Sequence, residues 1–161
     1  MVAVRDTHLK TGFDLQEWMA TLNLSDSDKQ ALTQVYEYCF NRLSEEPLRQ
    51  LLAHRSAEMI GILLTLHMDL DTLKTAILFP MLELNALTVE QASSDFSPVI
   101  GKLMQGVVDM DAIRFLQQFS MNDVSDTQVD NVRRMLLAMV EDVRAVVIKL
   151  AERITCLREV K

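Results

Sequence analysis

The sequence has little glycine, proline and cysteine: four, three and two residues, respectively, in a chain of 161. Such small amounts leave few places for tight turns and exclude a collagen-like repeat and a low-complexity chain. Two cysteines are also too few for a disulfide scaffold. Because Cys39 and Cys156 lie far apart, each within an apolar helical pattern, we expect both to be free thiols buried in the core.

Positive charge is also scarce: 16 Lys and Arg residues stand against 23 Asp and Glu residues, for a formal net charge of −7. Contact with phosphate groups requires clustered cationic side chains, so we expect neither direct nucleic-acid binding nor attachment to a membrane surface. No segment approaches the roughly 20 apolar residues that span a membrane, and the N-terminus lacks the apolar segment of a signal peptide. The sequence therefore predicts a cytoplasmic location.

Residues that usually build active sites are sparse too. The four glycines are scattered at positions 12, 61, 101 and 106, which excludes a glycine-rich phosphate-binding loop. His54 and His67 fall on one predicted helix about 20 Å apart, which is too far to share a metal, and His8 lies in the N-terminal segment. Composition and spacing alone thus reveal no active site.

The long segments are rich in leucine, methionine, alanine, glutamate, glutamine and arginine, which favour helix. We therefore predict an all-α fold, a single helical bundle over residues 1–161 without repeats or linkers. Capping boxes beginning at Ser27, Thr88 and Ser125 mark three helix starts. The expected helices cover residues 14–22, 27–43, 47–67, a segment from 71 or 72, a segment after 88, two shorter helices within 97–119, and one long or two abutting helices from 128.

Two of these helices have a distinctive pattern. The helix over 47–67 carries apolar residues almost all round, which predicts that it is buried in the middle of the bundle. In the next helix, Pro80 removes one backbone donor and is expected to produce a kink.

The C-terminal segment combines cations with apolar residues. Its cations either form a surface for an anion or an acidic partner, or pair with acidic residues three or four positions away on the same helices. Apolar residues near Ile148, Ile154 and Leu157 are expected to form an exposed face. Lys161 ends the chain without a helix stop signal, so we expect an N-terminal fragment of a longer protein. The cations are Arg133, Arg134, Arg144, Lys149, Arg153 and Arg158.

Three stretches make the sequence recognisable: ILLTLHMDLDTLKTAILFPMLE over 62–83, GKLMQGVVDM over 101–110, and NVRRMLLAMVEDVRAVVIKLAERI over 131–154, followed by LREV. They resemble the N-terminal hydrolase region of the long RelA/SpoT homologues, which make and degrade guanosine tetra- and pentaphosphate. The resemblance covers nearly the whole chain. It implies an all-helical HD domain, followed in the longer protein by a synthetase domain and regulatory domains.

For the longer protein, the resemblance implies a GTP pyrophosphokinase of the stringent response. Such an enzyme transfers pyrophosphate from ATP to the 3′ position of GTP or GDP with magnesium, on a ribosome that has met uncharged tRNA. The residues for that chemistry would lie outside this chain. The domain itself would act on the synthetase domain of the same chain as a scaffold or a restraint.

In active members of the family, a manganese ion is held by a histidine, a His-Asp pair and the aspartate of a KLAD-R stretch. The resemblance places the first histidine on Arg55, a permanent cation that cannot ligate a metal. The His-Asp pair falls on Phe79-Pro80, which offers no ligand atom, and the aspartate falls on Glu152. His54 is adjacent to Arg55, but one helical step turns its side chain by about 100°. We therefore expect no metal and no cofactor in this domain.

A Glu-Asp pair that assists the attacking water in the family falls on Glu83-Leu84, so only the glutamate remains. The resemblance therefore predicts a degenerate HD domain without hydrolase activity, in which Arg55 pairs with Glu152 or Glu83 where the metal would lie. Two alternatives stay open. One is a metal-dependent phosphohydrolase that uses a rearranged set of His54, Glu83 and Glu152, and the other is a pocket that binds a guanine nucleotide without cleaving it.

Overall fold

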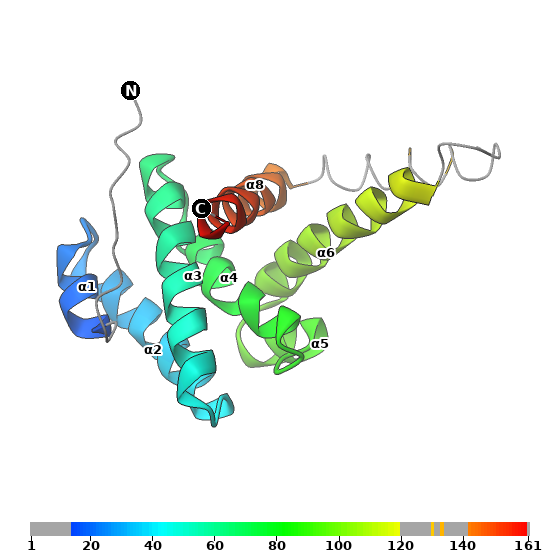
Figure 1. Ribbon diagram of the computed structural model, residues 1–161. Coiled ribbons are helices and arrows are strands. Elements are labelled where there is room, and N and C mark those ends of the chain that lie inside the picture. The colour runs from blue at the N-terminus through cyan, green and yellow to red at the C-terminus, as the bar shows by residue number, and fades with distance from the viewer. Residues whose placement is uncertain (1–13, 120–129, 131–132, 134–141, 161) are drawn as a thin grey trace.

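The computed structural model describes residues 14–119, 130, 133 and 142–160 (Figure 1). All regular secondary structure among these residues is α-helical, which confirms the predicted fold class. The helices are α1 (Leu15–Thr21), α2 (Asp26–Arg42), α3 (Glu46–Thr65), α4 (Leu70–Glu83), α5 (Val89–Asp95), α6 (Pro98–Phe119) and α8 (Val143–Glu159). None of the described helices is both long enough and apolar enough to cross a membrane.

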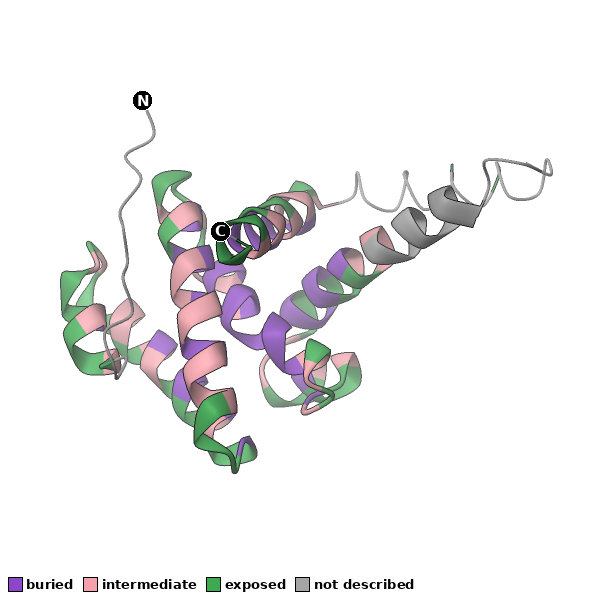
Figure 2. Cartoon of the chain, in the orientation of Figure 1, coloured by how far each residue is buried: buried purple, intermediate pink, exposed green. Residues whose placement is uncertain are grey.

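Helix α4 lies at the centre of the bundle and packs against α2, α3, α6 and α8 (Figure 1). Every residue from Thr75 to Met81 is buried, which Figure 2 shows as a continuous purple segment. The prediction that the helix over 47–67 occupies the middle was wrong, because α3 buries only one side and leaves Leu66 at its end 55% exposed. Helix α4 is therefore the element against which the other helices are placed.

The residues that start the helices differ in part from the prediction. Ser25, not Ser27, is the N-cap of α2, and its hydroxyl accepts a hydrogen bond from the Asp28 N–H at 3.2 Å. Asp69 is the N-cap of α4, which begins at Leu70, one or two residues before the predicted start. The capping box of Thr88 and Gln91 at the start of α5 is confirmed, with both of its hydrogen bonds present.

Residues Pro98–Phe119 form one helix, α6, and not the two shorter helices predicted within 97–119. Gly101 and Gly106 lie within it, and each is a point of close helix packing. A Cβ atom on Gly101 would lie 2.7 Å from the Ser93 Cβ of α5, and one on Gly106 would lie 2.9 Å from the Ala145 Cβ of α8. The glycines therefore let α5 and α8 approach α6 without ending it.

The C-terminal segment does not continue as one uninterrupted helix from 128. Asp142 has an extended backbone and caps a new helix, α8, by accepting a hydrogen bond from the Arg144 N–H at 3.0 Å. The predicted capping box at Ser125 lies outside the described residues. Pro80 stays inside α4, where it is buried. Both cysteines are free, as predicted, with Cys39 buried and Cys156 partly buried.

Candidate functional site

Helices α3, α4 and α8 pack against one another and carry the residues that the sequence analysis singled out. Arg55 lies on α3. Phe79, Pro80 and Glu83 lie on α4, and Leu84 is its C-cap. Glu152 lies on α8. The three helices thus bring together residues from positions about 100 apart in the sequence.

Arg55 is the centre of an ion-pair cluster that joins all three helices. Its Nη1 lies 3.1 Å from the Glu83 Oε2, so the predicted pair with Glu83 is present. Its Nε and Nη2 donate to the two carboxylate oxygens of Glu159 at 3.1 and 3.2 Å. Hydrogen bonding to Glu159 raises the pKa of Arg55 above its ordinary value, and the charges of Glu159 and Glu83 add to this effect. The guanidinium therefore stays a cation between two carboxylates.

Glu152 has a different partner from the one predicted. Its Oε2 lies 2.8 Å from the Lys149 Nζ, one turn earlier on α8, and its Oε1 accepts a hydrogen bond from the Cys156 thiol at 3.2 Å. The side chains of Lys149 and Glu152 are 13% and 10% exposed. Burial, together with the hydrogen bond to Glu152, raises the pKa of the Cys156 thiol to about 11. Of the two partners predicted for Arg55, Glu83 is therefore present and Glu152 is not.

Phe79 and Pro80 lie on α4 and are both buried. The Lys149 Nζ lies 5.9 Å from the centre of the Phe79 ring, within the range of a cation–π contact. Neither Phe79 nor Pro80 has a side-chain atom that can bind a metal. The positions at which the resemblance places the His-Asp pair are therefore occupied by two buried apolar residues.

These residues do not fit a divalent metal ion. A metal needs several converging oxygen, nitrogen or sulfur ligands, whereas Glu83 and Glu152 each contact a cationic side chain of the protein. Over the part of the chain that the structure describes, no group of three or more His, Cys, Asp or Glu residues could hold a metal. This includes the rearranged set of His54, Glu83 and Glu152, which do not gather into one cluster.

The other cations of the C-terminal segment bind α8 to its neighbours. The Arg144 guanidinium lies 2.7 Å from an Asp69 oxygen and 2.8 Å from an Asp142 oxygen. Arg158 contacts Glu58 on α3 at 3.0 Å. Among the ion pairs described for this segment, Lys149 and Glu152 have the predicted spacing along one helix, whereas the partners of Arg144 and Arg158 come from other elements or from the N-cap. Arg134 lies outside the described residues.

Helix α8 also carries an exposed apolar face. Ile148 is fully buried, contrary to the prediction, whereas Ile154 and Leu157 are exposed as predicted. Val143 and Leu150 lie on the same side, 64% and 57% exposed, since residues separated by seven positions share a helix face. The face of Val143, Leu150, Ile154 and Leu157 is termed the α8 apolar face below.

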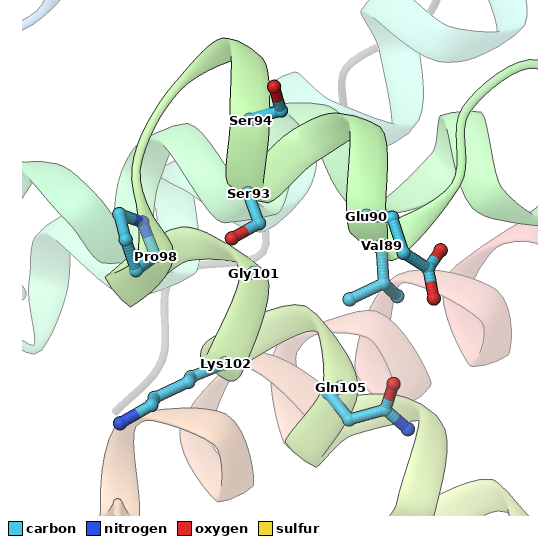
Figure 3. Close-up of a pocket in the computed structure, with 8 residues that line it drawn as sticks. All are labelled: Val89, Glu90, Ser93, Ser94, Pro98, Gly101, Lys102 and Gln105. Atoms are coloured by element: carbon cyan, nitrogen blue, oxygen red, sulfur yellow. The ribbon is translucent and has the colours of Figure 1, made fainter.

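A hollow of about 530 Å³ opens between α5 and α6 (Figure 3). Its lining holds one acidic and one basic side chain, Glu90 and Lys102, and neither a histidine nor a cysteine. No predicted site residue lines it, so the hollow is separate from the Arg55 and Glu152 clusters. The lining residues are Val89, Glu90, Ser93, Ser94, Pro98, Gly101, Lys102 and Gln105.

Sequence reasoning missed the pairing of Glu159 with Arg55 and the contact of Lys149 with Phe79. Both left a signal, because Glu159 follows Glu152 by seven residues and so lies on the same side of α8, and Lys149 precedes Glu152 by one turn. The direction in which each side chain turns depends on the packing of α8 against α3 and α4, which spacing along one helix does not give.

Comparison with known proteins identifies the relatives of this chain. The HD domain family matches residues 31–161. The whole chain is 47% identical to a GTP pyrophosphokinase of Escherichia coli K12 and 43% identical to one of Photobacterium angustum, and it spans 22% of the length of each. A guanosine-3′,5′-bis(diphosphate) 3′-pyrophosphohydrolase of Vibrio cholerae is 36% identical over 57% of this chain and 12% of its own length.

The family match covers most of the chain, and the fold around α4 agrees with its helical class. The match to the GTP pyrophosphokinases falls on their N-terminal region. The chain therefore belongs to the HD domain family and is homologous to the N-terminal region of RelA-type GTP pyrophosphokinases.

Proposed function

We propose that this chain is an HD domain that does not hydrolyse guanosine tetraphosphate and that serves a GTP pyrophosphokinase as a structural and regulatory part. One observation carries the proposal: the carboxylates of Glu83 and Glu152 contact Arg55 and Lys149, and the α4 residues Phe79 and Pro80 are buried and apolar. Hydrolysis in this family needs a metal that polarises a phosphate and activates water. The residues present support neither task.

The direct test is hydrolysis by the purified domain. The domain is incubated with manganese and guanosine tetraphosphate, and released pyrophosphate is measured, with the pyrophosphohydrolase of Vibrio cholerae as the positive control. We expect release no greater than in the sample without protein. Release that depends on manganese and disappears in the Glu152→Ala variant would instead establish a hydrolase with rearranged ligands.

A second candidate function is binding of a guanine nucleotide without cleavage, as the nucleotides handled by the relatives suggest. Titration calorimetry with guanosine tetraphosphate separates this candidate from a closed site. If the nucleotide binds to the Arg55 guanidinium, the wild type shows a heat of binding and the Arg55→Ala variant does not. We expect no heat with either protein, because the guanidinium is already held by Glu83 and Glu159.

For the longer protein we propose the activity of its relatives, GTP pyrophosphokinase, with magnesium in the synthetase domain and with the ribosome and uncharged tRNA as partners. Within that protein, the α8 apolar face is the surface of this domain that we assign to contact with the rest of the chain. Its four side chains are exposed although they are apolar, which is typical of a covered interface.

The contact is tested in the full-length protein. Leu150→Glu and Leu157→Glu place charges on the α8 apolar face without touching the buried side of the helix. We expect a changed rate of pyrophosphate transfer, because a restraint requires that the face contacts the synthetase domain differently in its active and inactive states. An unchanged rate in a folded variant would remove the regulatory role.

A further inference from the structure

The Lys149 side chain occupies an unusual environment for a lysine. It is 13% exposed, its ammonium lies 2.8 Å from the Glu152 carboxylate, and it stands 5.9 Å from the centre of the Phe79 ring. Lysine is among the residues that are least often buried unless they are paired. The position is therefore set by the carboxylate and the ring together, one on α8 and the other on α4.

Glu152 needs a positive charge at this position. Its residue exposure is 8%, and a buried carboxylate without a partner costs several kcal/mol in a protein interior. The Cys156 thiol supplies one hydrogen bond to Oε1, but a thiol is a weak donor and carries no charge. Lys149 provides the charge at Oε2, the other carboxylate oxygen.

We propose that Lys149 is the internal counter-cation of this site: its ammonium neutralises Glu152 and lies against Phe79, so that the chain itself supplies the charge that a bound metal supplies to acidic ligands. Arg55 does the same for Glu83 and Glu159. Active members of the family have a lysine at the same position, in the KLAD-R stretch. The role proposed for Lys149 therefore depends on the residues around it in this chain and not on the lysine alone. The inference rests on the proposed function in one respect: both require that no metal ion binds at Glu152.

Two consequences follow from an internal counter-cation. The folded domain gains no stability from divalent metal, because a ligand stabilises only when the folded state binds it. The charge of residue 149 affects the stability of the fold only while residue 152 is a carboxylate. Packing of the lysine stem would instead affect stability whether or not residue 152 is charged.

A double-mutant cycle with Lys149→Met and Glu152→Gln tests the proposal by urea unfolding at neutral pH. We expect Lys149→Met to raise the unfolding equilibrium constant roughly ten- to a hundredfold, since it leaves the carboxylate without its charge partner. In the Glu152→Gln background the same substitution should change it by less than about threefold. Lys149→Arg should stay close to the wild type, and Lys102→Met, at an exposed lysine of α6, is the matched control.

Equal effects of Lys149→Met in both backgrounds would overturn the proposal, because only packing would then be lost. If Lys149→Met does not fold, a folded double variant still supports charge compensation, and an unfolded double variant contradicts it. A separate measurement adds about 1 mM manganese chloride, or EDTA, to the wild type, and the melting temperature should not change. A manganese-dependent rise would contradict the internal counter-cation even if no pyrophosphate were released, so the two proposals can fail separately.

Discussion

Arg55 on α3 and Glu159 at the end of α8 are 104 positions apart in the sequence, yet two hydrogen bonds of 3.1 and 3.2 Å join them. The same guanidinium reaches Glu83 on α4. One side chain thus ties together the three helices that would surround the metal in an HD domain. The contact gives the position a structural role that a histidine at the same place would not have.

Replacement of Arg55 by alanine should therefore destabilise the domain. The three side chains are between 26% and 36% exposed, so solvent screening limits the expected loss to about 1 kcal/mol of the free energy of unfolding. The loss should shrink in high salt, because partly exposed ion pairs are screened. Urea unfolding at low and high sodium chloride measures both effects, and a neutral substitution at low salt would contradict the role of the cluster.

Restoring the family's ligand types tests whether Arg55, Phe79, Pro80 and Glu152 occupy the metal-binding positions. The variant with Arg55→His, Phe79→His, Pro80→Asp and Glu152→Asp carries four potential ligands in place of one cation, two apolar residues and one carboxylate paired with a cation. We expect manganese to raise its melting temperature, as binding to the folded state requires. The wild type is the control, and a folded variant that ignores manganese would show that the positions were assigned wrongly.

Gly106 and Gly61 form a matched pair of helical glycines. A Cβ atom on Gly106 would lie 2.9 Å from the Ala145 Cβ, whereas one on Gly61 meets nothing within 4 Å. Gly106→Ala should therefore cost about 1 to 3 kcal/mol by pushing α6 from α8. Gly61→Ala should add about 0.5 to 1 kcal/mol through helix propensity. Thermal unfolding of both variants measures the two changes in stability. If both substitutions stabilise or both destabilise the protein, the packing described for α6 and α8 is contradicted.

The cap of α8 predicts a dependence of stability on acid pH. Hydrogen bonding to Arg144 lowers the pKa of Asp142 below its ordinary value of 3.8. A lowered folded-state pKa means that the stabilisation is complete above 3.8 and is lost as the pH falls below it. The Arg144→Met variant should lose less stability over the same fall in pH, because the hydrogen bond from the Arg144 side chain is the main cause of the lowered pKa of Asp142. Stability measured from pH 6 to pH 2 tests this, and parallel curves for both proteins would contradict it.

The two thiols should react slowly in the folded protein. Burial raises the pKa of Cys39 to about 12 and that of Cys156 to about 11, so little thiolate is present near neutral pH. Iodoacetamide at pH 8 should label Cys156 before the buried Cys39, and both should react at once in urea. Mass spectrometry of the labelled peptides gives the order. Faster labelling of Cys39 would contradict its position in the core.

Patterns along the chain determined most of the fold. Helix formers, the scarcity of glycine and proline, and local caps such as Thr88 with Gln91 depend on residues a few positions apart, and they located the helices to within a few residues. The predictions failed where distant residues decide. Two shorter helices were predicted within 97–119, but one helix, α6, continues through Gly101 and Gly106, where α5 and α8 pack closely against it.

The candidate site divides in the same way. From the sequence, the family resemblance predicts that Arg55, Phe79, Pro80 and Glu152 stand at the positions of the metal ligands, because this assignment needs only the residue at each matched position. Only the tertiary structure decided which cation meets which carboxylate. The energy of an ion pair between two helices depends on the distance between the two charges. The spacing of residues along one helix does not give that distance. Packing of α8 against α3 and α4 turned Arg55 to Glu83 and Glu159 and left Glu152 to Lys149.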